Sequence, residues 1–92
     1  MIMQFEYLAK SEEVRNEPGT NPYKYVLCVL PGNSVTPYVT WMEVYHPDEG
    51  TYSRSSGHYH TTEHEAIEDF KNRVGHTPWR FYYRFADENH QL

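Results

Sequence analysis

The sequence predicts an α+β fold, an antiparallel β-sheet of about five strands in a meander with one main α-helix packed on one face. Several segments alternate apolar and polar residues or are continuously apolar and β-branched, as strands are. Short turn sequences join three of these segments. One further segment has the 3.6-residue period and the capping residues of a helix. The 92 residues suffice for one modest core, so we expect a single domain over residues 1–92.

Four strands are predicted ahead of the helix, each rich in aromatic or β-branched residues. Their predicted ranges are residues 1–8, 23–30, 38–45 and 51–60. Charged residues, two prolines and a glycine predict a loop over residues 11–22. Tight-turn sequences occupy residues 31–33 and 46–50. These short connections predict an antiparallel meander for the last three of the four strands.

The helix is predicted over Thr62–Val74. Thr62 and Glu65 have the spacing of a capping box, in which each side chain accepts a hydrogen bond from the other residue's backbone N–H. Basic residues in the last turn suit the helix dipole, and Gly75 is placed to end the helix. Apolar residues at helical spacing predict the buried stripe, which consists of Ala66, Ile67, Phe70 and Val74.

A last strand is predicted over Trp79–Phe85. Its alternation places Trp79, Phe81, Tyr83 and Phe85 on one face and Arg80, Tyr82 and Arg84 on the other. Arginine beside an aromatic ring can stack on unpaired bases. Because the chain has only eight basic residues, spread along its length, we expect this face to be the solvent-facing or partner-facing side of an edge strand.

Composition narrows the classes of function. Thirteen acidic and eight basic residues give a net charge of −5, so neither direct nucleic acid binding nor binding to an anionic membrane is expected. The single cysteine, Cys28, excludes an intramolecular disulfide and a Cys-rich zinc site, and its apolar neighbours predict a buried, inert thiol. Neither a signal peptide nor a membrane-spanning segment is predicted, which favours a cytoplasmic protein.

No arrangement typical of an enzyme is present in the sequence. It contains neither the GxSxG sequence of a nucleophile elbow nor a glycine-rich phosphate loop. Its carboxylates fall mostly in neighbouring pairs, which is typical of a solvated surface. Glu43, between Met42 and Val44, is expected to point out of a half-exposed strand. We therefore predict a protein that is not an enzyme and has no cofactor.

The histidines leave one alternative open. His58 and His60 are two residues apart on a predicted strand and share one of its faces, and His64 follows in the first turn of the helix. Two strand histidines and a third ligand can bind zinc or nickel, although His64 begins a segment without the second histidine of an HExxH motif. Solvent-facing polar side chains are the favoured interpretation, and a small His-based metal-binding domain is the alternative.

Carboxylates are densest in the predicted helix, where residues 63–69 contain four of them and no lysine or arginine. Helix positions four apart differ by ~6 Å of rise, close to the phosphate spacing along a nucleic acid strand. Glu65 and Asp69 are such a pair, although like charges at this spacing cost a helix ~0.2–0.5 kcal/mol. The candidate phosphate-mimicking residues are Glu12, Glu13, Glu17, Asp48, Glu49, Glu63, Glu65, Glu68 and Asp69.

In its length, its Met1–Phe5 start, its aromatic-rich strands and the glutamate-rich segment TTEHEAIEDF, the chain resembles the anti-restriction nuclease proteins (Arn) of T-even phages, a family of DNA mimics. The resemblance covers all 92 residues. It implies a homodimer in the host cytoplasm that occupies the DNA-binding surface of a modification-dependent restriction endonuclease of the McrBC type. It also implies binding to histone-like nucleoid proteins. A net charge of −5 is low for such a mimic, whose basic residues would have to lie off the binding face.

The function predicted from the sequence is a non-enzymatic inhibitor whose carboxylates pair with lysines and arginines of a DNA-binding protein. Such binding is strongest at low salt. The aromatic strands would provide a rigid platform and a dimer interface. A generic protein-interaction adaptor with aromatic contacts is a second alternative.

Overall fold

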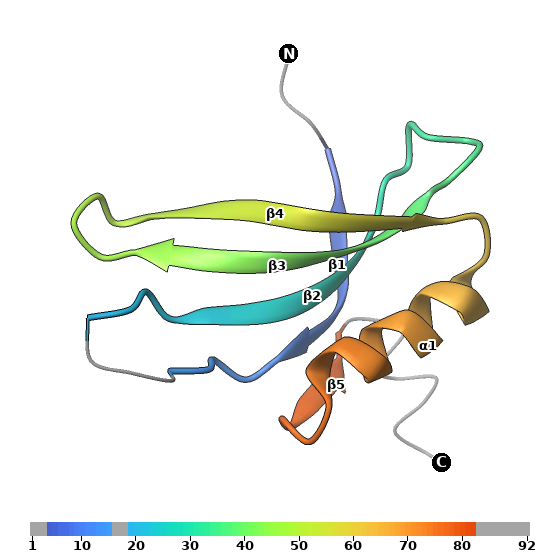
Figure 1. Ribbon diagram of the computed structural model, residues 1–92. Helices are drawn as coiled ribbons and strands as arrows, with labels where there is room; N and C mark the ends of the chain where they lie inside the picture. The colour runs from blue at the N-terminus through green and yellow to red at the C-terminus, as the bar shows by residue number, and fades with distance from the viewer. Residues whose placement is uncertain (1–3, 16–18, 83–92) are drawn as a thin grey trace.

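Five antiparallel strands form one sheet in the order β4-β3-β2-β1-β5, and one helix lies against one face of it (Figure 1). The computed structural model describes residues 4–15 and 19–82. The predicted α+β class and the antiparallel sheet with one helix are confirmed. The elements are β1 (Glu6–Ser11), β2 (Tyr23–Val29), β3 (Tyr38–His46), β4 (Thr51–His60), α1 (Glu63–Val74) and β5 (Trp79–Phe81).

Strands β2, β3 and β4 form the predicted meander, with bounds close to those expected. The first strand differs, since β1 extends through Lys10 and Ser11, beyond the predicted end at residue 8. It extends because β1 is paired on both sides: Lys10 lies opposite Val26 of β2 and opposite Arg80 of β5. Strand β5 is an edge strand, as predicted. Residues 1–3 of the first predicted strand and 83–85 of the last lie outside the described residues.

Helix α1 ends at Val74 as predicted and begins at Glu63, one residue later than predicted, with Thr62 as its N-cap; the Glu65 side chain accepts a hydrogen bond from the Thr61 hydroxyl at 3.3 Å. The Thr62 side chain accepts a hydrogen bond from the backbone N–H of Glu65 at 3.2 Å. At the other end Gly75 has a φ of 59° and donates its N–H to the carbonyl of Lys71. This positive φ is one that glycine adopts without strain. Of the predicted stripe, Ala66, Phe70 and Val74 are buried and Ile67 is half-buried.

The sheet buries apolar side chains on both of its faces. Beneath α1, Leu8, Ala9 and Leu27 pack with the helix stripe, and the rings of Trp79 and Phe81 border this cluster. On the other side, which we call the open face, lies a second cluster built on β2 and β3. Its buried members are Val26, Cys28, Leu30, Val39 and Trp41, with Phe5 and Tyr7 packed against them.

Cys28 belongs to the second cluster and is fully buried, as predicted. Burial raises the pKa of its thiol to about 12, so the reactive thiolate does not form near neutral pH. No helix in the described part of the chain has the length and apolarity needed to span a membrane, since α1 has only 12 residues.

Candidate functional site

Two strand histidines and a threonine converge on Asp69 of α1. His58 Nδ1 and His60 Nε2 each lie 3.1 Å from Asp69 Oδ2. The Thr40 hydroxyl donates a 2.6 Å hydrogen bond to the same oxygen. Arg73 Nη1 in turn donates to Thr40 Oγ1 at 2.9 Å and to the carbonyl of Ser56 at 2.8 Å. Helix α1 is thereby tied to β3 and β4 through polar contacts at the margin of its packed stripe.

The hydrogen bonds of this cluster stabilise the ionised form of Asp69. Burial on its own raises the pKa of Asp69, but the hydrogen bonds from Thr40, His60 and His58 outweigh burial and hold the pKa below its usual value. Asp69 is therefore ionised at neutral pH and already bound within its own chain. It does not form the exposed pair with Glu65 that the helical spacing suggested, because Glu65 lies on the exposed side of α1.

The structure brings together only part of the predicted histidine group. His58 and His60 do share one face of β4, as their spacing predicts, and both contact Asp69. His64 is exposed on α1 and is not among the contacts of Asp69. Over residues 4–15 and 19–82, no group of three or more His, Cys, Asp or Glu side chains is arranged to hold a metal ion.

A second polar cluster lies on the open face and is centred on Glu43. The side chain of Glu43 is 3% exposed, so the expectation that it points out of a half-exposed strand is wrong. The Tyr7 hydroxyl donates a 2.6 Å hydrogen bond to Glu43 Oε2, and Arg54 Nη2 lies 3.0 Å from that oxygen. Lys24 Nζ is 3.8 Å from Oε1. Burial and the hydrogen bond to Glu43 raise the pKa of Tyr7 to about 12, so its hydroxyl keeps its proton and donates.

The partners of Glu43 explain why local sequence does not predict its burial. Tyr7 is 36 residues away in the sequence, and Arg54 reaches Glu43 across the β3–β4 pair. One feature of the sequence does indicate the burial of Glu43. In the alternation of a strand, Glu43 falls on the same face as Val39 and Trp41, which are buried.

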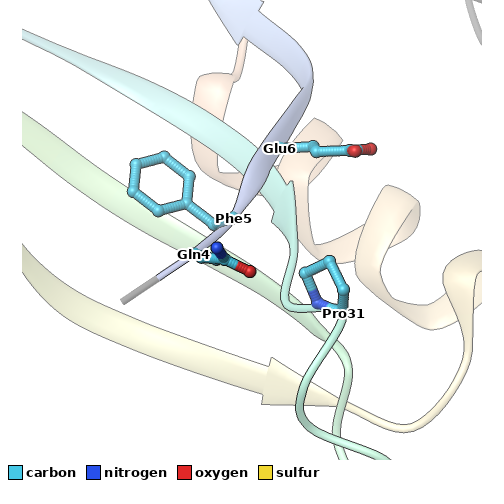
Figure 2. Close-up of a pocket in the computed structure, with 4 residues that line it drawn as sticks. All are labelled: Gln4, Phe5, Glu6 and Pro31. Carbon is cyan, nitrogen blue, oxygen red and sulfur yellow. The ribbon is translucent and has the colours of Figure 1, made fainter. Parts of the chain in front are cut away.

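Two shallow hollows indent the described surface, and neither is lined by Glu43 or Asp69. The first, of about 340 Å³, is lined by Gln4, Phe5, Glu6 and Pro31. Figure 2 shows Phe5 and Glu6 pointing to opposite sides of β1. Among the residues that line this first hollow, only Glu6 has a titratable side chain, so the hollow contains no acid–base pair. The second, of about 350 Å³, lies where β1 meets β5 and includes Lys10, Arg80 and Tyr82.

The predicted phosphate-mimicking carboxylates fall into two exposed groups. The helix group is Glu65 and Glu68 on α1, next to a half-buried Glu63. The sheet-end group comprises Glu12, Glu13, Asp48 and Glu49. The loop after β1 reaches the β3–β4 end of the sheet, because Val14 pairs with Tyr23 and Pro22 accepts a backbone hydrogen bond from Tyr45 (Figure 1). Glu17 lies outside the described residues.

The cations are distributed differently from the carboxylates. Four of the seven described lysines and arginines are half-buried against the sheet, namely Lys10, Lys24, Arg54 and Arg73. The exposed cations are Arg15, Lys71 and Arg80. The exposed carboxylates are Glu6, Glu12, Glu13, Asp48, Glu49, Glu65 and Glu68. The described surface therefore carries seven exposed carboxylates against three exposed cations, two of which are paired with a carboxylate: Arg15 with Glu13 and Lys71 with Glu68.

No protein-family model, curated protein or solved structure matches the chain. The resemblance to anti-restriction proteins therefore stays a prediction from the sequence.

Proposed function

We propose that the protein is a non-enzymatic inhibitor whose exposed carboxylates take the place of DNA phosphates on a basic DNA-binding protein. One observation carries this proposal: the fold draws four of the seven described lysines and arginines against the sheet and leaves seven of the ten described carboxylates exposed. A net charge of −5 therefore understates how acidic the accessible surface is. The sequence-based objection that basic residues dilute the acidic surface is weakened accordingly.

The helix group supports the proposal by its spacing and its weak internal pairing. Glu65 and Glu68 are three residues apart, so their Cβ atoms are about 5–6 Å apart on the exposed side of α1. Lys71 Nζ lies 3.8 Å from Glu68 Oε2, and both side chains are about half exposed. Exposed ion pairs of this kind contribute little free energy. An arginine of a binding partner can therefore replace Lys71 at low cost.

The sheet-end group adds a second anionic surface at a distance from the first. Asp48 and Glu49 lie in the turn before β4, whereas Glu65 follows the other end of β4 (Figure 1). The ten residues of β4 extend over about 30 Å, the length of about nine base pairs of DNA. Two anionic groups at this separation suit a basic groove that normally holds a short duplex.

The partner that we propose is a modification-dependent restriction endonuclease of the McrBC type, with histone-like nucleoid proteins as a second target. We propose further that the protein acts in the host cytoplasm as a homodimer. These statements derive from the family resemblance, and the exposed carboxylates support only the part of them that requires a basic partner.

A cleavage assay tests the proposal. A modification-dependent endonuclease digests methylated plasmid while the protein is added in increasing amounts, at low and at high salt. We expect protection at low salt that weakens at high salt. In the Glu65→Gln/Glu68→Gln double variant, protection should need about tenfold more protein, because two charge-assisted contacts are lost. Glu6→Gln, which neutralises an exposed carboxylate outside both groups, is the control and should protect normally.

Two results would count against the proposal. Absence of protection at every protein ratio removes the anti-restriction function. Protection that is equally strong in the double variant and insensitive to salt removes the carboxylates from the mechanism and favours an aromatic interaction surface.

A further inference from the structure

The open face of the sheet gathers four of the seven described lysines and arginines. Lys10 lies opposite Val26, a member of the open-face cluster, and is therefore on that face. Arg80 lies opposite Lys10 in the β1–β5 pair and shares the face. Lys24 and Arg54 reach it as well, since both contact Glu43 there.

Lys10 and Arg80 form a like-charge pair across β1 and β5. They are direct cross-strand partners, an arrangement that destabilises a sheet when both side chains are charged. Among the described ion pairs, neither residue has an acidic partner. Their contacts are aromatic instead: Lys10 Nζ is 3.9 Å from the ring centre of Tyr7 and 5.1 Å from that of Tyr82. Arg80 Cζ lies 5.2 Å from the same Tyr82 ring.

The cation pair borders the hollow of about 350 Å³ at the β1–β5 margin. This volume lies within the range of small-ligand sites. Trp79 and Tyr82 contribute rings to the lining, and Glu12 is its one carboxylate. An anion placed here would relieve the repulsion between Lys10 and Arg80, and a planar group beside it could stack on Tyr82.

Further rings lie across the open face at the β4 margin. Tyr59 is opposite Val39, and Tyr52 lies under Lys24 Nζ at 5.4 Å, which places both tyrosines on this face. Each of these tyrosines is 50% exposed. A chain that crosses the sheet from β5 to β4 would thus meet the cations and the half-buried Tyr82 first, and then the exposed rings of Tyr52 and Tyr59.

We propose that the open face binds single-stranded nucleic acid, with Lys10 and Arg80 on phosphates and Tyr82 stacked on an unpaired base. Single strands are favoured over duplexes because their bases present free ring faces to aromatic side chains. This proposal departs from the expectation drawn from net charge, because the negative charge is concentrated at α1 and at the sheet end. It uses other residues than the proposed inhibitor function, apart from Glu12, which belongs to the sheet-end group and also lines the hollow.

Fluorescence anisotropy with a labelled oligothymidine of about ten nucleotides tests the proposal. We expect saturable binding at low salt by the full-length protein. Lys10→Gln/Arg80→Gln should weaken binding at least tenfold and lower the slope of log affinity against log salt by about 1.4, which corresponds to two phosphate contacts. Arg15→Gln/Lys71→Gln changes the net charge equally but alters cations outside the hollow, so it should bind nearly normally.

A second arm isolates stacking and checks the fold. Tyr82→Leu should weaken oligothymidine binding about tenfold, whereas Tyr82→Phe retains the ring and should bind as the native protein does. Circular dichroism verifies that each variant keeps its sheet. Glu12→Gln removes the one carboxylate of the hollow and should strengthen binding.

Several outcomes overturn this proposal without touching the inhibitor function. These are absence of binding at low salt, equal loss of binding in the Arg15/Lys71 control, or tighter binding to duplex than to oligothymidine. If inorganic polyphosphate competes fully and Tyr82→Leu has no effect, the hollow binds anions only, which also overturns it. Conversely, Glu65→Gln/Glu68→Gln should leave oligothymidine binding intact while it weakens endonuclease inhibition.

Discussion

The Tyr7 hydroxyl donates a 2.6 Å hydrogen bond to Glu43 Oε2 and so joins β1 to β3 across the intervening strand β2. Arg54 Nη2 contacts both groups, at 2.8 Å from the Tyr7 oxygen and 3.0 Å from Glu43 Oε2. A carboxylate that is 3% exposed is tolerable only with such partners, because an unpaired buried charge costs several kcal/mol. This cluster therefore ties β1, β3 and β4 together on the open face.

Tyr7→Phe should lower the free energy of unfolding by about 1–2 kcal/mol, since Glu43 loses one donor but keeps Arg54. Urea unfolding at neutral pH measures the change. The matched control is Tyr52→Phe, whose side chain is half exposed and whose loss of a hydroxyl should change stability little. Equal losses in the two variants would contradict the role given to the Tyr7–Glu43 contact.

Gly57→Ala should destabilise the protein by about 1–3 kcal/mol through overpacking. A Cβ atom at position 57 would lie 2.9 Å from Trp41 Nε1, and the Trp41 side chain is nearly buried. Thermal unfolding measures the loss of stability, and a change in tryptophan fluorescence, to which Trp41 and Trp79 both contribute, reports the altered packing. Gly32→Ala serves as the control because a Cβ atom at position 32 would meet no other atom within 4 Å. An equal loss of stability in that variant would refute the packing argument.

Asp69→Asn should cost about 1–3 kcal/mol at neutral pH and less in acid. The pKa of Asp69 is lower in the folded than in the unfolded protein, so its contribution is full above the unfolded pKa, near 3.8. It is lost as pH falls through the lower folded pKa. Unfolding free energies measured from pH 7 downward should therefore begin to converge for native protein and variant at about pH 4 and approach each other further as pH falls through the lower, folded pKa. A gap that stays constant with pH would contradict the ionised state of Asp69.

The Cys28 thiol should be unreactive toward a disulfide reagent at pH 8 in the folded protein and react fully in urea. Burial raises its pKa to about 12 from 9.0, so folding favours the protonated thiol. The corresponding stability is complete below pH 9 and falls as pH rises from about 9 toward 12. Rapid stoichiometric reaction under native conditions would show that the open-face cluster admits solvent.

Local patterns suffice to predict the fold class, the three-stranded meander and the ends of α1. Each of these depends on neighbours in the sequence, as the Thr62 cap and Gly75 illustrate. The extent of β1 is not predictable in this way, because Lys10 and Ser11 become strand residues through partners in β2 and β5. Pairing between distant segments leaves little trace in the sequence of either one.

The candidate sites are predicted only in part for the same reason. His58 and His60 share a face as their spacing requires, but the sequence pattern places their partner Asp69 among the exposed carboxylates. Asp69 lies next to the buried Phe70 at the edge of the apolar stripe. At such an edge position, helical periodicity alone does not show whether a side chain faces the sheet or the solvent. The uneven exposure of basic and acidic side chains is not predictable for a similar reason. Lys24 of β2 and Arg54 of β4 are half-buried because each contacts Glu43 on the neighbouring strand β3.

The most direct test of the inhibitor proposal is a map of backbone amide chemical shifts during titration with an arginine-rich peptide, which stands in for a basic DNA-binding surface. We expect saturable shifts at Glu65 and Glu68 of α1 and at Asp48 and Glu49 of the β3–β4 turn, which diminish as salt is added. The amide chemical shifts of open-face residues away from Glu12, such as Val26 and Cys28, should not change. Shifts that concentrate on the open face, or that are absent from both carboxylate groups, would contradict the proposal that exposed carboxylates act as phosphate surrogates.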